Sequence, residues 1–463
     1  MKKLFTIIFA SMTIFSCSNE MELMNNETKV LDAKTLEVSN DVTLDDIQNY
    51  MEKGSSIASR NGGNGKIEAI TYQNDTVMYL LKYANGWEMM PSDKRFPLRV
   101  AYNDEGTLDY ENMHDGQRTW FESMAEEIHV MKKLGKGIEN KYCKVWNAFS
   151  KKGKKKESNS RSQNGEWILH NTREESTITE KPHLITTAWH QGVTKWYQEY
   201  ILEEYNMYCP MQTNREYHRP VGCTAVAGGQ VLFHLHKQGW SLSDIPNTAM
   251  PIDTIYSFTN PMEIVWSGVE DGQTEAIAKL LGHVGVLSHM NYEDWGSGAY
   301  LRDGLEEAFD HYGIECSILD FWDITEMRTN LNSNLPVIVS MTGRDNKNEY
   351  VGHTVIVDGY KNITTNYTDV YIYIEDPNTY PGDIYDHDEG MEPLPEEGPT
   401  QEESYTVNST YLYINWGDGN IDNTSYYASN DLYYHYTDEN TNEQFRVTFD
   451  REKRMLYNLS QKE

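Results

Sequence analysis

A basic stretch divides this otherwise acidic chain. Residues 132–161 contain 11 Lys or Arg and only two acids, whereas the whole chain has 71 Asp and Glu against 40 Lys and Arg, a net charge of −31. Residues 151–165 contain no apolar side chain and so lack what packs a core. We therefore predict a protease-accessible linker between two folded parts. A basic run of this kind can alternatively bind an anionic surface.

Composition limits what the two parts can be. The chain has 463 residues, of which 38% are hydrophobic, with 11 Trp and 32 Tyr. That is enough for two or three domains with cores of their own, and it excludes global disorder. The acidic balance argues against a nucleic-acid partner, because phosphates would be repelled by such a surface.

The N-terminus has the features of an export signal. Two lysines precede an apolar run over residues 4–15, which is too short for a stable transmembrane span. The sequence Ile-Phe-Ser-Cys at 14–17 resembles a bacterial lipobox, in which Cys17 becomes the lipidated first residue of the mature protein. We expect a signal peptide over 1–16 and an exported lipoprotein at the outer membrane or cell surface, held by its lipid. The alternative is an ordinary cleaved signal with an incidental Cys.

The next part of the chain has the pattern of a small α+β unit. Two strand-like runs flank Asn85-Gly86, the strongest short-range hairpin signal. A third strand is predicted over 96–102, and the spacing of apolar residues predicts an amphipathic helix over 119–134. We place the end of an N-terminal tether at residue 65, this unit at 66–145 and the linker at 146–165.

The first candidate for chemistry is Cys223. It follows Gly222, which permits a close backbone approach, and a helix is predicted to begin near it. A thiol at the positive end of a helix dipole has a lowered pKa and forms the nucleophilic thiolate more readily. The alternative for a lone Cys is a buried structural thiol. Gly228 and Gly229 weaken the predicted helix by about 1 kcal/mol each relative to Ala, and would let another element pack closely.

Two downstream segments favour a nucleophilic role for Cys223 over a structural one. His353 begins a β-branched run ending in Asp358-Gly359, so a strand would hold it rigidly, as a general base requires. A second strand ends in Asn415-Trp416, where the amide can orient an imidazole and the indole can shield that bond. A Cys, a His and an Asn in this order form the arrangement of papain-like thiol proteases. Upstream, Gln191 precedes Cys223 and is a candidate donor to an oxyanion, although a lone Gln is usually a surface residue.

These motifs together resemble the streptopain family of cysteine peptidases, the C10 group. The shared features are Trp-x-Gln, Gly-Cys-x-Ala-x-Ala-x-x-Gln, Gly-His-x-x-Val-x-Asp-Gly-Tyr and Asn-Trp-Gly, and the resemblance covers most of residues 70–435. It implies an α+β fold: a papain-like catalytic domain over 166–463, preceded by a small inhibitory prodomain. It further implies Cys223 as nucleophile, His353 as base and then acid, and Asn415 and Gln191 in support. Trp416, Gly222 and Gly352 would belong to the substrate cleft. The expected partners are protein or peptide substrates and the chain's own prodomain, without a cofactor.

Three departures from the family pattern stand out. In the helix predicted after Cys223, Gly228 and Gly229 replace residues that are usually better helix formers. Asp418 follows Asn-Trp-Gly, where the family usually has a second Trp, and an acidic insertion lies near 378–408. Asp383, Asp386 and Asp388 in that insertion are hard oxygen ligands that suit calcium, but they lack EF-hand spacing, and we expect no metal.

Two functions follow from these observations. The first is a lipid-anchored cysteine endopeptidase made as a zymogen. The second is a surface binding or inhibitory protein that keeps the peptidase fold without turnover, which Asp418 and the altered helix would suit. Retention of Cys223, His353, Asn415 and Gln191 together favours the enzyme.

Overall fold

The structure, a computed structural model, describes residues 40–53, 55–61, 65–110, 113, 115–133, 141–147, 149, 166–191, 204–213, 218–242, 266–294, 296–344, 350–374, 399–419, 426–428, 433–437, 444–448 and 453–462. All of them lie in one compact unit, Ser39–Glu463. The predicted signal peptide, Cys17, most of the basic linker and the acidic residues at 383–397 lie outside the described residues.

The N-terminal segment, residues 40–149, is a small antiparallel sheet with helices. Its helices are α1 (Leu44–Lys53), α2 (Ser56–Arg60), α3 (Asp115–Lys133) and α4 (Lys141–Asn147), and its strands are β1 (Lys66–Tyr72), β2 (Asp75–Lys82), β3 (Trp87–Pro91) and β4 (Ala101–Asn103). The predicted hairpin and amphipathic helix are confirmed as β2–β3 and α3. The strand predicted over 96–102 is wrong for its first part, because residues 96–100 take no strand conformation and β4 begins at Ala101. Trp146 is fully buried on α4, so packed structure continues into the basic stretch.

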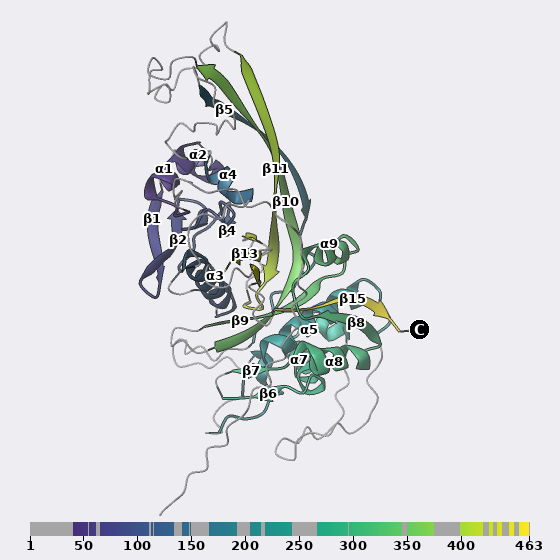
Figure 1. The fold of residues 1–463 in the computed structure, drawn as a ribbon. Coiled ribbons are helices and arrows are strands. Elements are labelled where there is room, and N and C mark those ends of the chain that lie inside the picture. The colour runs from purple at the N-terminus through teal and green to yellow at the C-terminus, as the bar shows by residue number, and fades with distance from the viewer. Residues whose placement is uncertain are drawn as a thin grey trace, which may run out of the picture. The chain divides into compact units, whose positions relative to one another are not determined.

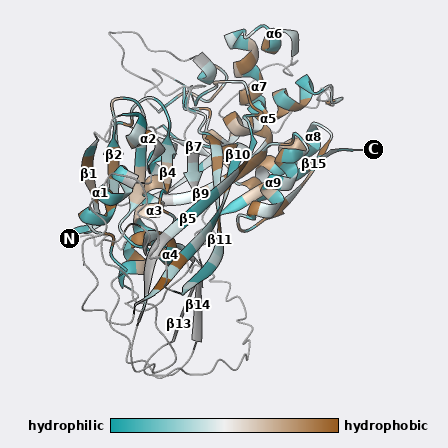
Figure 2. Ribbon diagram, turned by 90° about the horizontal axis from the view of Figure 1, so that it is seen from above, coloured by the Kyte–Doolittle hydropathy of each residue, from teal (hydrophilic) through white to brown (hydrophobic). Residues whose placement is uncertain are grey.

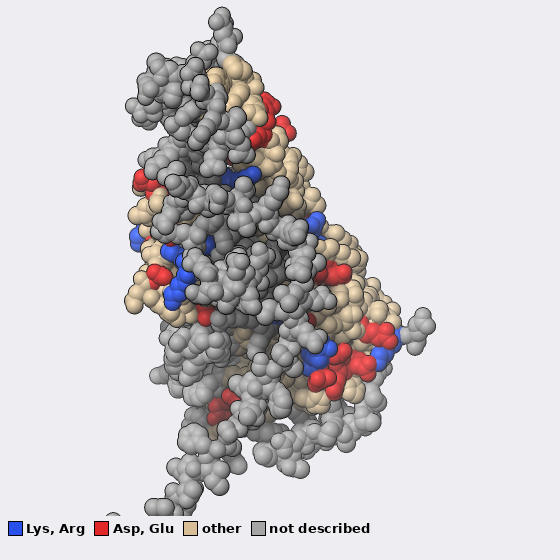
Figure 3. Space-filling view, in the orientation of Figure 1, with Lys and Arg blue, Asp and Glu red and all other residues tan. Residues whose placement is uncertain are grey.

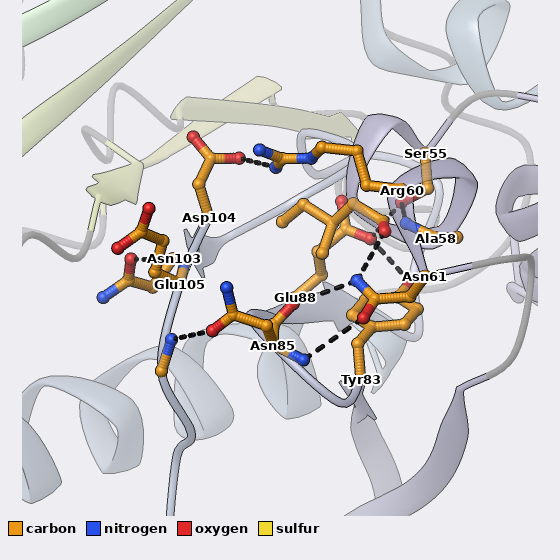
Figure 4. Close-up of polar contacts among 12 residues, drawn as sticks. Ser55, Ala58, Arg60, Asn61, Tyr83, Asn85, Glu88, Asn103, Asp104 and Glu105 are labelled. Atoms are coloured by element: carbon orange, nitrogen blue, oxygen red, sulfur yellow. Dashed lines mark hydrogen bonds and ion pairs between the residues drawn. The ribbon is translucent and has the colours of Figure 1, made fainter.

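Polar contacts fix the turn between β2 and β3 (Figure 4). Gly86 has a φ of 95°, a left-handed value that favours glycine. Beside it, Asn85 Oδ1 accepts a hydrogen bond from the N–H of Gly106 at 2.8 Å, and Asn61 Nδ2 donates to the Asn85 carbonyl at 3.0 Å. The buried Glu88 accepts hydrogen bonds from the hydroxyls of Tyr83 and Ser55. The turn is therefore held by neighbouring elements as well as by its own sequence.

The C-terminal segment, residues 166–462, alternates helices and strands. The helices are α5 (Cys223–Lys237), α6 (Trp266–Glu270), α7 (Thr274–Leu287), α8 (Glu306–His311) and α9 (Ile324–Asn332), with a 3-10 turn η1 (Glu204–Asn206) and a π-helical turn η2 (Leu301–Leu305). The strands are β5 (Glu166–Lys181), β6 (Asn291–Tyr292), β7 (Ser297–Gly298), β8 (Ile314–Leu319), β9 (Val337–Arg344), β10 (Tyr350–Ile374), β11 (Thr400–Asn415), β12 (Tyr426–Ala428), β13 (Tyr433–Thr437), β14 (Gln444–Thr448) and β15 (Arg454–Gln461). The α+β class predicted from the sequence is confirmed.

One sheet joins both segments. Its strands follow the order β1-β2-β3-β4-β12-β11-β10-β9-β15-β8, and β5 also pairs with β10. The long strands β5, β10 and β11 run side by side as an antiparallel ribbon (Figure 1). The expectation that the His353 strand ends at Asp358-Gly359 is wrong: β10 continues to Ile374 and only shifts register between Val357 and Gly359. A bulge of this kind interrupts pairing locally without ending the strand.

Helix α3 packs on the part of the sheet that belongs to the C-terminal segment. A single buried apolar cluster includes Trp120, Met124 and Ile128 of α3 together with Val339 of β9 and Val355 of β10. A second cluster is built around α5 and α7, whose largely apolar composition is visible in Figure 2. The core that supports β10 is thus shared between the two segments.

The described surface carries charges of both signs. On the face seen in Figure 3, Lys and Arg side chains are interspersed with Asp and Glu. Within the described part of the chain, no helix combines the length and apolar character needed to cross a membrane.

Candidate active site

Cys223 is the first residue of α5, as predicted. The preceding Gly222 is the N-cap with a φ of 89°, and a Cβ added there would lie 2.8 Å from the Ser297 carbonyl oxygen and from Met290 Sδ. Gly222 is therefore required both by its conformation and by the close approach of a neighbouring backbone. The result is a thiol at a helix N-terminus, where the dipole favours a negative charge.

His353 lies within hydrogen-bonding reach of the Cys223 thiol. Burial raises the pKa of Cys223, but the charge and hydrogen bond of His353 and the contacts of Thr354 outweigh it, so that the pKa is lowered to about 7. The Thr354 N–H donates to Cys223 Sγ at 3.3 Å. Both residues of the pair are buried, with exposed fractions of 9% for Cys223 and 7% for His353. This arrangement favours a thiolate near neutral pH.

The imidazole is held on its far side by a backbone carbonyl. His353 Nε2 lies 3.3 Å from the carbonyl oxygen of Trp416, whose side chain is 1% exposed. The Asn415 carboxamide is engaged elsewhere: its Oδ1 accepts from the Gly417 N–H at 3.0 Å, and its Nδ2 donates to the Thr187 carbonyl at 3.3 Å. Asn415 thus supports the loop that presents the Trp416 carbonyl, where the sequence suggested a direct bond to the imidazole.

The segment carrying Gln191 is brought to the same loop. The backbones of His190 and Asp418 pair in an isolated antiparallel β-bridge, and a Cβ added at Gly419 would lie 3.1 Å from the His190 ring. Gln191 is half-buried next to this bridge. Among the hydrogen bonds of the described residues, none is made by the Gln191 side chain, so its role as an oxyanion donor stays a prediction.

Gly352 occupies open space beside His353. It is exposed, and a Cβ added there would meet no atom within 4 Å. On the other side of Cys223, the Thr224 hydroxyl donates to the Ala299 carbonyl at 3.0 Å, which fixes the chain that follows β7 against α5.

Helix α3 of the N-terminal segment begins at the site. A Cβ added at Gly116 would lie 2.3 Å from Nε2 and Cδ2 of His353 and 3.0 Å from Cε3 of Trp416. The first turn of α3 thus lies directly against the ring of His353. Gln117, in the same turn, donates from Nε2 to the hydroxyl of the buried Tyr427 at 2.8 Å.

The structure adds residues that the sequence reasoning did not identify. Trp416 acts through its backbone carbonyl and Thr354 partly through its backbone N–H, and residue type does not reveal backbone contacts. Gly116 occurs in a helix without any motif. Gln230 lies in the Gly-Cys-x-Ala-x-Ala-x-x-Gln pattern, which was the one available signal, and it is 1% exposed.

Two other thiols and one other histidine have structural surroundings. Cys143 and Cys209 are buried, and burial raises the pKa of Cys209 well above the usual range for a thiol. His236 stacks on Trp266 and lies 2.9 Å from a Glu270 oxygen. Within the described residues, no cluster of three or more His, Cys, Asp or Glu suits a metal ion.

Comparison with known proteins agrees with the motifs. Residues 196–374, which contain Cys223 and His353, match the model of the Peptidase C10 family. The family inferred from the motifs is therefore confirmed over this segment. A search of curated proteins found no match.

Two solved structures from Prevotella intermedia are similar. A mutant fragment of prointerpain A is 15% identical with a TM-score of 0.46, and the alignment covers 85% of this chain and 98% of the fragment. Active wild-type interpain A, a cysteine protease, is 19% identical with a TM-score of 0.35, over 60% of this chain and 94% of that one.

Proposed function

We propose that this chain, whose residues 196–374 match the Peptidase C10 family, is the zymogen of an exported cysteine endopeptidase. The observation that carries the proposal is the Cys223–His353 pair at the N-terminus of α5, with a thiol pKa lowered to about 7. In the reaction, the Cys223 thiolate attacks the scissile carbonyl and His353 protonates the leaving amine. Water then hydrolyses the thioester, with His353 as base.

The N-terminal segment acts as an inhibitory prodomain in this proposal. Support comes from Gly116, because the first turn of α3 lies directly against the ring of His353, the proposed base. Cleavage in the basic linker at 150–165, after the buried Trp146 and Phe149, would begin activation.

Self-processing tests the proposal. The full-length chain and its Cys223→Ala variant are incubated, and cleavage at 146–165 is followed by mass spectrometry and by hydrolysis of a peptide library. We expect the wild type to cut itself and library peptides, and the variant to do neither. If both are equally inert, even after an added protease has cut the linker, the chain is not a peptidase.

Attachment to a membrane through Cys17 is a separate part of the proposal. It is supported by the apolar run at 4–15 and by the Ile-Phe-Ser-Cys sequence at 14–17. A Cys17→Ser variant should lose incorporation of labelled fatty acid and move from the membrane fraction to the soluble exported fraction. Labelling that survives this substitution would contradict the lipid site.

A further inference from the structure

Gln230 connects the three segments that carry the candidate catalytic residues. It lies on α5 seven residues after Cys223, about 10 Å along the same face of the helix. Its Oε1 accepts hydrogen bonds from the Thr187 hydroxyl at 2.7 Å and from the Trp189 N–H at 3.4 Å, in the segment that leads to Gln191.

The same side chain faces Asn415 amide to amide. Gln230 Nε2 donates to Asn415 Oδ1 and Asn415 Nδ2 donates to Gln230 Oε1, each at 3.4 Å. Asn415 also donates to the Thr187 carbonyl, so three segments meet at one pair of amides, of which Gln230 is buried and Asn415 is half-buried. With 1% exposure, Gln230 has little water to replace a lost partner, and an unpaired buried amide is costly.

This pair lies next to the group that holds His353. Asn415 precedes Trp416, whose carbonyl oxygen lies 3.3 Å from His353 Nε2, and Asn415 Oδ1 accepts from the Gly417 N–H. The Asn415 side chain thus contacts the Thr187 carbonyl on one side and the Gly417 N–H on the other, which fixes the backbone around the Trp416 carbonyl. Gln230 connects Asn415 to α5, the helix that bears Cys223.

We infer that Gln230 is a positioning residue for the peptidase reaction: through Asn415 it sets the place of the Trp416 carbonyl and hence the orientation of His353 toward Cys223. It does not touch the reacting atoms. The inference rests on the proposed function, since it assigns Gln230 a role in that reaction.

The test uses the full chain cut in its linker by an added protease. Gln230→Met keeps the side-chain length and removes the hydrogen bonds, whereas Gln230→Glu keeps an acceptor for Thr187, Trp189 and Asn415. Thr187→Val removes only the shortest bond. Asn330→Leu is the matched control, because Asn330 is also a buried amide that joins a helix to a strand, through Asn458, on α9 away from the site.

Two readouts separate positioning from stability. For Gln230→Met we expect kcat to fall by about 100-fold, as a small misplacement of a catalytic group does, with KM little changed. The pH midpoint for alkylation of Cys223 should move upward, because a misoriented His353 stabilises the thiolate less. In Gln230→Glu, kcat and the alkylation midpoint should both lie between those of Gln230→Met and those of the wild type. Thr187→Val should lower kcat and raise the midpoint by less than Gln230→Met does.

Asn330→Leu should lower the melting temperature without moving the alkylation midpoint. Gln230→Met and Thr187→Val with wild-type kcat and midpoint would overturn the inference, and should Gln230→Met not fold, Thr187→Val alone decides. Alkylation needs no turnover. An inert wild type would therefore refute the proposed function, while the alkylation midpoints would still decide the role of Gln230.

Discussion

Gly116 of α3 and His353 of β10 approach so closely that a single added carbon would collide: a Cβ at Gly116 would lie 2.3 Å from the imidazole Nε2. The two residues lie in different segments of the chain, on either side of the basic linker. The contact places the proposed prodomain directly against the proposed catalytic base, and it makes the absence of a side chain at residue 116 a requirement of the latent state.

Enlarging Gly116 should weaken latency. In Gly116→Val the first turn of α3 must move away from His353 and Trp416, because the rings of these two residues leave no room for a Cβ. We expect faster self-cleavage in the linker and measurable peptide hydrolysis by the uncut chain. Arg118→Ala, in the same turn and half-buried, is the control and should keep wild-type latency. Unchanged processing in Gly116→Val would show that this contact does not restrain the enzyme.

The reactivity of Cys223 should follow its lowered pKa. Alkylation by iodoacetamide of the linker-cleaved protein should rise with pH through a midpoint near pH 7, where the thiolate forms. In His353→Ala the midpoint should move toward about 8.5 or above, because burial remains and the opposing charge is lost. A Cys223→Ala sample corrects for the other thiols. A wild-type midpoint at the ordinary thiol value would contradict the pairing.

A buried ion pair should hold the two segments together. Glu127 of α3 lies 3.1 Å from Lys453, which immediately precedes β15, and their side chains are 5% and 7% exposed. Glu127→Gln leaves a buried ammonium without its partner, so we expect a loss of about 3–5 kcal/mol in the free energy of unfolding, measured by urea denaturation. The double variant Glu127→Leu with Lys453→Met should recover most of that loss, since replacing both charges removes the unpaired group. A double variant as unstable as the single one would mean that the pair itself is strongly stabilising.

His183 should make stability depend on pH. Burial lowers the pKa of His183, but the hydrogen bond and charge of Asp358, 2.9 Å away and fully buried, raise it overall. Its stabilising contribution is therefore complete below the unfolded pKa of about 6.5 and is lost as pH rises through the higher folded pKa. The melting-temperature difference between wild type and His183→Gln should be widest near pH 6 and should narrow at alkaline pH. A melting-temperature difference that widens as the pH rises would contradict the upward shift of the His183 pKa.

Local sequence signals predicted much of this architecture. The Asn85-Gly86 turn, the apolar spacing of α3, the start of α5 at Cys223 and the end of β11 at Asn415 all depend on near neighbours in the chain. The family motifs then predicted that the Cys223 thiol, the His353 imidazole and the Asn415 amide belong to one site.

Relations between distant residues were beyond reach of the sequence. The Trp416 carbonyl holds His353 through its backbone, and backbone atoms are the same for every residue type. The continuation of β10 beyond Gly359 is stabilised by pairing with β5, nearly 200 residues earlier, which local turn chemistry cannot anticipate. The contact of Gly116 with His353 likewise joins two segments, and a glycine in a helix gives no sign of what lies against it.

Gly229 should show this limit in a single substitution. Helix propensity favours Ala over Gly by about 1 kcal/mol, so the sequence alone predicts that Gly229→Ala stabilises α5. The structure predicts the opposite, because a Cβ at Gly229 would lie 2.3 Å from Cδ2 of the buried Leu281 on α7. We expect a net loss of roughly 1–3 kcal/mol in unfolding free energy from overpacking. The double variant Gly229→Ala with Leu281→Ala gives the new methyl group room, so Gly229→Ala should cost less in that background than alone. If Gly229→Ala alone stabilises the protein, α5 and α7 can separate enough to accept the methyl group. The helix propensity of Ala then outweighs the cost of packing against Leu281.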